Sequence, residues 1–368
     1  MLWLVEVVRD EQIDLVAIAG DLYDRAIPPA DSVVLMRELL LQLRSFGVTV
    51  VAIAGNHDGA ERVSAYDGLL DAASVYLRGG YARAGGVLTL QFNDGPLDIV
   101  AVPYLDPILA PAELVVTVSD GEPERTRRTH QSVLVDALGA ASQHRSSAQH
   151  RSSPRSIVIA HAFVTGGEVS ESERLLTVGG TGQVDISIFE GHSYVALGHL
   201  HRPQQVGSTT RRYSGSPLPY SFSEQHLKQI VIIDLDVNGV CDVREITVPV
   251  GRAVATISGT MHELLESAQH EIVADCFIRA VVTDTGQVID AKSRLRERFP
   301  FVTEVLLQPP VASGDRDGAV GPTERAQLSP LVAAEAFWLD VTSEAPDDSE
   351  HALLESILTR ATLEANAR

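Results

Sequence analysis

The chain has 368 residues, with 29 Lys and Arg against 49 Asp and Glu, so its formal net charge is −20. Apolar residues make up 45% and charged residues 21%, which excludes a wholly disordered chain and suits two or three globular domains. The acidic balance argues against a protein that holds nucleic acid by bulk charge, but not against an enzyme that cuts nucleic acid at a local site.

The first half of the chain alternates apolar runs with stretches of helical periodicity. Helices are predicted over 31–46, with Asp31 or Ser32 as the cap, and over 61–73. Strands are predicted over 13–19, 48–54, 87–92, 97–102, 157–160, 194–197 and 229–236. Near-continuous apolar strands separated by helices predict an α/β fold whose sheet is buried on both faces.

A short polar repeat interrupts this pattern, because Gln143–Ser147 recurs as Gln149–Ser153. We expect a flexible insertion over about 143–155, after a helix that ends near Ser142. The histidines and arginines of the repeat could contact DNA, but a solvated loop is the favoured interpretation.

A smaller α+β unit is predicted after a first domain that spans 1–250. Within 251–308, strands are expected over 253–257, 276–283 and 302–307, and helices over 261–268 and 288–298. Residues 309–329 are rich in Gly, Pro and charge, which is typical of a linker. The tail, 330–368, holds two amphipathic helix candidates around Phe337 and Trp338, and we favour docking to a partner over packing on its own domain.

Four of the apolar runs end in side chains that bind metals. In chain order these side chains are Asp21, Asn56, His161, and the pair His199 and His201. Because ligands gather outside the carboxyl ends of strands in α/β sheets, we expect these side chains at one rim. Oxygen and nitrogen ligands without thiolate suit Mn²⁺, Fe or Zn, and a pair of such ions activates water for attack on a phosphoryl group.

Two neighbouring residues suggest a role beside the metals. His57 follows Asn56 and can face a substrate, where it would stabilise the transition state or protonate the leaving oxygen. Asp58 could orient the His57 ring and raise its pKa. His199 and His201 lie two apart, so they face the same way on a regular strand, whereas a bend after Gly198 would aim them at different metals.

Each motif also has a structural interpretation. A lone Gly-Asp pair is usually a turn, and a lone histidine such as His161 is usually structural. Gly55–Asp58 and Gly198–His201 are more specific, since each follows a predicted strand. Their order and their matching strand contexts favour a site over chance.

These motifs, in this order, resemble the calcineurin-like metallophosphoesterases. The stretches 20–25, 55–62 and 213–221 resemble, more narrowly, the DNA double-strand break repair nuclease subunits of that family. The resemblance covers residues 1 to about 308 and is weaker in the tail. It implies a β-sandwich flanked by helices, a small α+β capping domain that faces DNA, and a C-terminal helical docking segment.

The resemblance also implies an activity and partners. The activity is a 3′–5′ exonuclease on double-stranded DNA ends and an endonuclease on single strands and hairpins, with Mn²⁺, as a homodimer with an ABC-type ATPase. Asp21 would bridge two metals, Asn56, His161 and His199 would complete one site, and His201 would belong to the other. His57 would be the transition-state histidine, and the tail would dock the coiled-coil base of the ATPase.

One family motif has no counterpart, because residues 1–20 contain no histidine and the first motif is a strand that ends in Asp-x-His. Two ligands of the first metal are therefore missing. We expect a truncated or mis-started reading frame rather than a true one-metal variant. Two other functions stay open: a metallophosphoesterase for another phosphate ester, such as a phosphoprotein or cyclic nucleotide, and a catalytically impaired scaffold subunit.

Compartment signals are few. No run of eighteen apolar residues is present, and the N-terminus lacks the pattern of a secretory signal. Cys241 and Cys276 are the only cysteines, which excludes a disulfide framework. We expect a cytoplasmic protein.

Overall fold

The structure is a computed structural model that describes residues 2–111, 128–147, 153–170, 173, 182–249, 251–286, 288–309, 329–342 and 345–366. The chain divides into two compact units, Met1–Pro309 and Pro310–Arg368. In the described ranges no helix is long and apolar enough to cross a membrane. Of the predicted linker, residues 310–328 lie outside the described residues.

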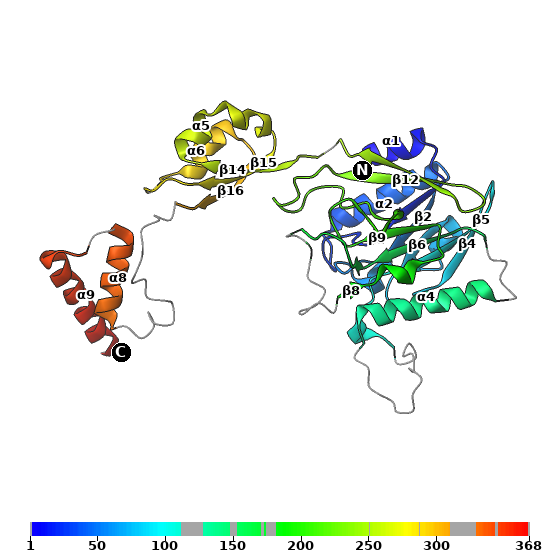
Figure 1. The fold of residues 1–368 in the computed structure, drawn as a ribbon, viewed down its shortest axis with the longest axis horizontal. Coiled ribbons are helices and arrows are strands. Elements are labelled where there is room, and N and C mark those ends of the chain that lie inside the picture. Colours follow the sequence, from blue (N-terminus) through cyan, green and yellow to red (C-terminus); the bar gives the residue numbers. More distant parts are fainter. Residues whose placement is uncertain are drawn as a thin grey trace. The chain divides into compact units, whose positions relative to one another are not determined.

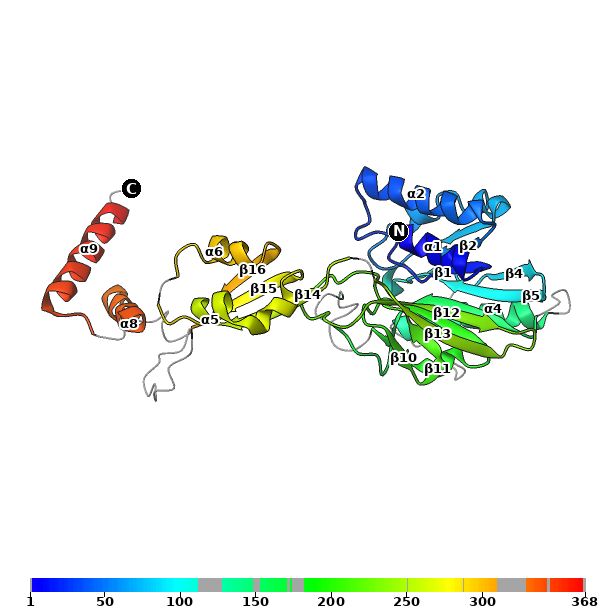
Figure 2. The ribbon, with the colours of Figure 1, turned by 90° about the horizontal axis from the view of Figure 1, so that it is seen from above.

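A small parallel sheet and two helices form one side of the first unit. The elements are α1 (Leu2–Asp10), β1 (Leu15–Ile18), α2 (Ala30–Ser45), β2 (Thr49–Ile53) and β3 (Val75–Arg78). The strands lie in the order β1-β2-β3, and α1 and α2 cover the outer face (Figure 2). Val8 of α1, Leu39 and Leu43 of α2, and Val50 of β2 form one buried cluster there. Burying these side chains offsets the entropy lost on ordering the two helices.

A six-stranded sheet forms the other layer. Its strands are β4 (Val87–Phe92), β5 (Gly95–Val102), β6 (Ser156–His161), β9 (Tyr194–Gly198), β10 (Gln204–Val206) and β11 (Ser208–Tyr213), in the order β10-β11-β9-β6-β5-β4. Helix α4 (His130–Ser146) lies along its outer face, with Leu134 packed in the cluster of Val158 (Figure 1). On the inner face, Ile159 shares a cluster with Val51 and Ile53 of β2.

The central strand β6 is buried along its whole length, because α4 covers one face and the small sheet covers the other. This arrangement confirms the predicted fold class, a β-sandwich flanked by helices. Strands β5, β6, β9 and β11 pair in parallel, so their carboxyl ends meet at one rim. His161 pairs with Gly198 at that rim.

The remaining elements of residues 1–250 are short or peripheral to the two sheets. They are α3 (Ala60–Val63), η1 (Leu70–Ala73), η2 (Pro107–Leu109), β7 (Phe163–Val164), β8 (Gln183–Val184), η4 (Ile186–Phe189), β12 (Gln229–Leu235) and β13 (Cys241–Thr247). The predicted helix over 61–73 is wrong as one element, because it is split into two short turns. Gly68 lies between them with φ +82°, outside helical geometry. Strand β3 was not predicted, and α2 begins after Pro29 with no side-chain cap, so neither Asp31 nor Ser32 caps it.

The predicted insertion over 143–155 is wrong at both of its ends. Helix α4 continues to Ser146, and the Arg145 Nε donates to the Asp98 carboxylate at 3.0 Å. The Ser153 N–H donates to the same carboxylate oxygen at 3.2 Å, and Ser153 and Arg155 are both buried. These residues are fixed by a buried acid on β5, which local composition does not reveal. Residues 148–152 lie outside the described residues.

The structure predicts that acid destabilises the sandwich through His192. Burial, together with the charges of Arg145 and Arg211, lowers the pKa of His192 from 6.5 to about 4. Between these values the unfolded chain binds the extra proton, so the free energy of unfolding falls as the pH falls. We expect a loss of about 2 kcal/mol between pH 6.5 and pH 4.5 from this group. Urea unfolding of the wild type and of His192→Asn checks it; equal losses in both proteins would contradict the assignment.

A second module of the first unit follows residue 251. Its elements are β14 (Val254–Gly259), α5 (Met261–Glu266), η5 (Ala268–Val273), β15 (Phe277–Val282), α6 (Ala291–Arg298) and β16 (Val302–Leu307). The strands form a parallel sheet in chain order, and Leu264 and Leu295 of the helices join Ile278 in its buried core. Thr260 caps α5 through a reciprocal pair of hydrogen bonds with Glu263. The predicted α+β pattern of strands and helices is therefore present.

The second unit contains α8 (Pro330–Thr342) and α9 (Asp348–Asn366), at the positions where two helices were predicted. The His351 Nε2 of α9 and the Glu335 Oε1 of α8 lie 2.7 Å apart. Several large apolar side chains of this pair are exposed, among them Phe337 at 70% and Val341 at 66%. The pair therefore leaves apolar surface that packing between its own helices does not cover.

Candidate metal centre

Asp58 joins the two loops that follow β1 and β2. One of its carboxylate oxygens accepts the N–H groups of Gly55, at 2.8 Å, and Leu22, at 3.0 Å, and the other accepts the N–H of Tyr23 at 3.0 Å. Burial raises the pKa of Asp58, and these three donors oppose that shift. Both oxygens of the Asp58 carboxylate thus accept hydrogen bonds from the backbone of the two loops.

His57 is held by its backbone and by one ring nitrogen. Its N–H donates to the Asp21 Oδ1 at 2.9 Å, and its Nδ1 lies 3.0 Å from the Asp24 carbonyl oxygen. A carbonyl oxygen only accepts, so Nδ1 carries a proton and Nε2 is the acceptor of the neutral ring. The prediction that Asp58 orients the His57 ring is wrong, because the Asp24 carbonyl has that position and Asp58 serves the loop amides.

His161 lies at the centre of the rim and is almost fully buried. Its Nδ1 donates to the Ala19 carbonyl oxygen at 2.9 Å, so the neutral ring has its lone pair on Nε2. That Nε2 lies 2.9 Å from the Asn56 Oδ1 and 3.5 Å from the Asp21 Oδ2. Three electron-donating atoms from three strand ends therefore converge.

His199 adds a fourth donor to this group. Its Nδ1 lies 3.1 Å from the Asn56 Oδ1, and its ring packs edge-on against that of His161. Burial, together with nearby His161, lowers the pKa of His199 to about 3. His199 is therefore neutral at pH 7, the state that metal binding requires. Its φ of +106° is strained for a residue with a side chain, as is common at functional sites.

The spacing of these donors fits a bound cation. Two ligand atoms that each lie about 2.1 Å from one metal, at right angles, are about 3 Å apart. The His161 Nε2 lies 2.9 Å from the Asn56 Oδ1 and 3.5 Å from the Asp21 Oδ2, whereas the 3.1 Å between the His199 Nδ1 and the Asn56 Oδ1 is also the length of an ordinary hydrogen bond. The neutral His161 ring carries its proton on Nδ1, which donates to the backbone, so its Nε2 has none. The lone pairs of the His161 Nε2 and the Asn56 Oδ1 therefore repel each other unless a cation or a proton lies between them.

Two glycines allow the loops to approach this closely. A Cβ on Gly20, where φ is +97°, would collide with the Nδ1 of His161, and a Cβ on Gly55 would collide with the Asp21 carboxylate. Any larger residue at either position would push a loop out of the rim. The Gly-Asp and Gly-Asn pairs in the sequence are thus requirements of the site's geometry.

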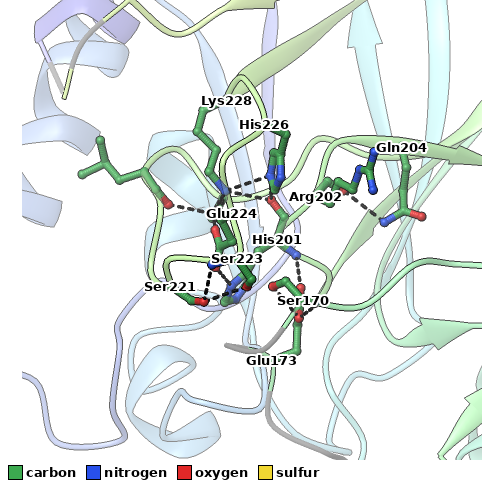
Figure 3. A network of polar contacts seen from close by, with 12 residues as sticks. Ser170, Glu173, His201, Arg202, Gln204, Ser221, Ser223, Glu224, His226 and Lys228 are labelled. Carbon is green, nitrogen blue, oxygen red and sulfur yellow. Dashed lines mark hydrogen bonds and ion pairs between the residues drawn. The ribbon is translucent and has the colours of Figure 1, made fainter. Parts of the chain in front are cut away.

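His201 belongs to a separate group of contacts (Figure 3). Its Nδ1 lies 3.0 Å from the Glu224 Oε1, and its N–H donates to the Glu173 Oε1 at 2.7 Å. The structure thus brings Asp21, Asn56, His161 and His199 together, and directs the His201 ring to Glu224. Of the two arrangements that the sequence left open, the bent one is present.

No three His, Cys, Asp or Glu side chains among the described residues are placed to hold a metal by themselves. The close group depends on the amide of Asn56, which joins His161, His199 and Asp21. The Asp-x-His ligands that the resemblance implies are absent from residues 1–20. Among the described residues, the close donors thus form one group around the Asn56 amide.

Comparison with known proteins identifies the fold family. A family model described as calcineurin-like phosphoesterase matches residues 1–203, more than half of the chain. The chain belongs to the calcineurin-like phosphoesterases. It is also similar to the SbcD subunit of nuclease SbcCD from Staphylococcus epidermidis, with 27% identity over 294 residues that cover 79% of this chain and 74% of that protein.

Membership of the calcineurin-like phosphoesterases confirms the predicted class of hydrolase and the use of divalent metal. The matched region ends two residues beyond His201, so it contains all seven of the residues predicted for the site. Together with the relative, it supports the predicted resemblance to SbcD-like metallophosphoesterases.

Sequence reasoning missed Glu224 and Lys228. Both follow the stretch 213–221, which carried the narrower resemblance, but no role was assigned to that stretch. The two residues lie four apart and pair in the structure, but residues 224–228 are not helical, so their spacing gave no helix-based signal. What the sequence does not show is that this pair is buried beside His201.

Proposed function

We propose that the chain is the nuclease subunit of an SbcCD-type complex in DNA repair and recombination. It would act as a 3′–5′ exonuclease on double-stranded DNA ends and as an endonuclease on single strands and hairpins. The observation that carries the proposal is the convergence of four donors, from Asp21, Asn56, His161 and His199, at one rim of the sandwich. The similarity to the SbcD subunit of nuclease SbcCD supports DNA as the substrate.

The four donors would hold Mn²⁺, which suits mixed carboxylate, amide and imidazole ligands. When bound, the ion would lower the pKa of a water molecule and neutralise charge on a phosphoryl group. Asp21 accepts the His57 N–H through Oδ1, which leaves Oδ2 on the side of His161. His201 would serve a second ion, as the resemblance implies.

His57 would act on the substrate. Its Nδ1 is held by the Asp24 carbonyl, so Nε2 is the nitrogen that can take up or give a proton. Protonated at Nε2, the ring would donate a hydrogen bond to the phosphoryl or leaving oxygen as charge develops there. Because the His57 N–H also bonds Asp21, the residue couples the substrate side of the site to the metal side.

The test compares two substrates with Mn²⁺ present: a labelled blunt-ended DNA duplex and the small diester bis(4-nitrophenyl) phosphate. We expect cleavage of the DNA, and at least one Mn²⁺ per chain after equilibration. Two ions per chain would support a two-metal nuclease despite the missing motif. Activity on the small ester alone would contradict the nuclease and favour a phosphoesterase for another substrate.

A second candidate function has its own observation. Among the described residues no three His, Cys, Asp or Glu side chains are grouped to hold a metal, which favours a catalytically impaired subunit that serves as a scaffold for DNA and the ATPase. Such a scaffold would bind DNA and its partner without cutting. DNA cleavage that disappears in His57→Ala would exclude it.

We further propose the organisation that goes with this function. Residues 1–250 form the nuclease domain and 251–308 the capping domain that faces DNA, while 309–329 link them to the docking helices of 330–368. The protein would be cytoplasmic and form a homodimer.

The tail is predicted to bind an SbcC-like ABC ATPase. Exposed Phe337 and Val341 on α8 would pack against the partner's coiled coil, since apolar side chains of this size rarely stay in water without cause. We expect deletion of 329–368 to abolish co-elution with the ATPase and to leave Mn²⁺ binding unchanged. The milder variant Phe337→Ser should weaken the complex. Undiminished co-elution after the deletion would refute the assignment.

A further inference from the structure

His201 is held at three atoms by side chains that lie outside the phosphoesterase motifs (Figure 3). Its N–H donates to Glu173, and its carbonyl oxygen accepts from the Lys228 Nζ at 3.1 Å. Its ring Nδ1 lies 3.0 Å from the Glu224 Oε1. Backbone and ring are therefore both constrained, which is more than a surface histidine requires.

Glu224 is built into the interior. Its side chain is 0% exposed, and that of Lys228 is 7% exposed. Lys228 donates to the other Glu224 oxygen, Oε2, and to the Ser216 hydroxyl at 2.8 Å. Burying a charge costs several kcal/mol unless its geometry and hydrogen bonds compensate. The hydrogen bonds of Glu224 and Lys228 to each other and to their neighbours supply that compensation. Burial also lowers the pKa of Lys228, a shift that its contact with Glu224 opposes.

We propose that Glu224 is a positioning residue that fixes the His201 ring with its proton on Nδ1 and its lone pair on Nε2, and that Lys228 orients Glu224 for this task. A carboxylate only accepts, so the neutral ring must place its proton on the nitrogen that faces Glu224. Carboxylates that hold metal-binding histidines in this way set both the tautomer and the direction of the ring. The role of the Nε2 lone pair as a metal ligand rests on the proposed function. The position of the ring proton on Nδ1 does not.

The structure provides a variant that should reverse the tautomer. In Glu224→Gln, Lys228 is a donor only, so it takes the amide oxygen. The amide NH₂ then faces His201 and donates to Nδ1, which drives the ring proton to Nε2. Adding Lys228→Met releases the amide, whose oxygen can turn back to the Nδ1 proton. The double variant also removes the unpaired buried charge, so it tests the idea even where Glu224→Gln alone folds poorly.

The first measurement is nitrogen NMR of the full chain labelled with ¹⁵N-histidine, without metal, with the His201 signals assigned from His201→Asn. We expect the Nδ1–H form in the wild type, the Nε2–H form in Glu224→Gln, and the Nδ1–H form again in the double variant. The matched control is Glu168→Gln, which removes an exposed carboxylate paired with neighbouring Arg202 and should change nothing. An unchanged tautomer in Glu224→Gln, or Nε2–H in the wild type, would overturn the proposal.

The second measurement separates this proposal from the proposed function. Titration with Mn²⁺ should show an affinity about 10-fold or more weaker in Glu224→Gln than in the wild type or in Glu168→Gln. A wild type that binds no Mn²⁺ but shows the tautomer reversal would defeat the proposed function and leave Glu224 as the positioning residue. If the wild type and Glu224→Gln bind Mn²⁺ with equal affinity and show the same His201 tautomer, Glu224 is not a positioning residue, and the proposed function stands.

Discussion

Replacing His57 with alanine is expected to lower kcat for DNA cleavage by about 10²- to 10³-fold and to leave Mn²⁺ binding unchanged. The variant removes the ring that would stabilise the transition state. It keeps the backbone N–H that donates to Asp21, and it leaves the three amides that Asp58 binds. The loops and the four donors should therefore stay in place while the substrate loses its proton donor.

Single-turnover cleavage of the duplex, paired with an Mn²⁺ titration of the same preparations, measures both effects. His144→Ala is the matched control, since His144 is an exposed histidine in the last turn of α4. We expect that control to keep wild-type kcat. A His57→Ala protein with unchanged kcat would remove His57 from the chemistry, and one that no longer binds Mn²⁺ would make it a structural part of the metal site.

The positions of the site residues could be predicted because strand ends are visible in the sequence. Asn56 follows β2 of the small sheet and His161 ends β6 of the larger one, and the packing of the two sheets brings these strand ends to one rim. The hydrogen bonds within the rim could not be predicted in the same way. Asp58 is next to His57 in the chain but serves the amides of both loops, and the Ala19 carbonyl, 142 residues away, sets the tautomer of His161.

The fold was predictable where periodicity is local and not where order depends on distant partners. Strand β6 and the elements of the second module follow directly from their apolar patterns. By contrast, the polar composition around Arg145 indicates a solvated loop, while its guanidinium lies against a buried acid 47 residues earlier. Similarly, nothing local distinguishes Glu224 from any exposed glutamate. Long-range polar contacts decide both cases, and spacing does not encode them.

Replacing Asp98 with alanine should lower the free energy of unfolding by about 3–5 kcal/mol. Asp98 is fully buried on β5 and accepts hydrogen bonds from Arg145, Ser153 and the Thr89 hydroxyl. Alanine would leave a largely buried guanidinium without its counter-charge and two further donors without an acceptor. Because these donors come from β4, the end of α4 and the segment before β6, the loss should spread over that whole edge of the sandwich.

Urea unfolding measures the effect, and Asp10→Ala is the control because the Asp10 pair with Arg9 is exposed and should contribute little. A double variant, Asp98→Leu with Arg145→Met, removes both charges, so it should recover much of the stability that Asp98→Ala loses. A cost below about 1 kcal/mol for Asp98→Ala would mean that residues 143–155 are a solvated loop in solution, as their composition suggests. A large cost that the double variant reverses would show that one buried acid holds the end of α4 against the sheet, at the edge away from the metal-binding rim.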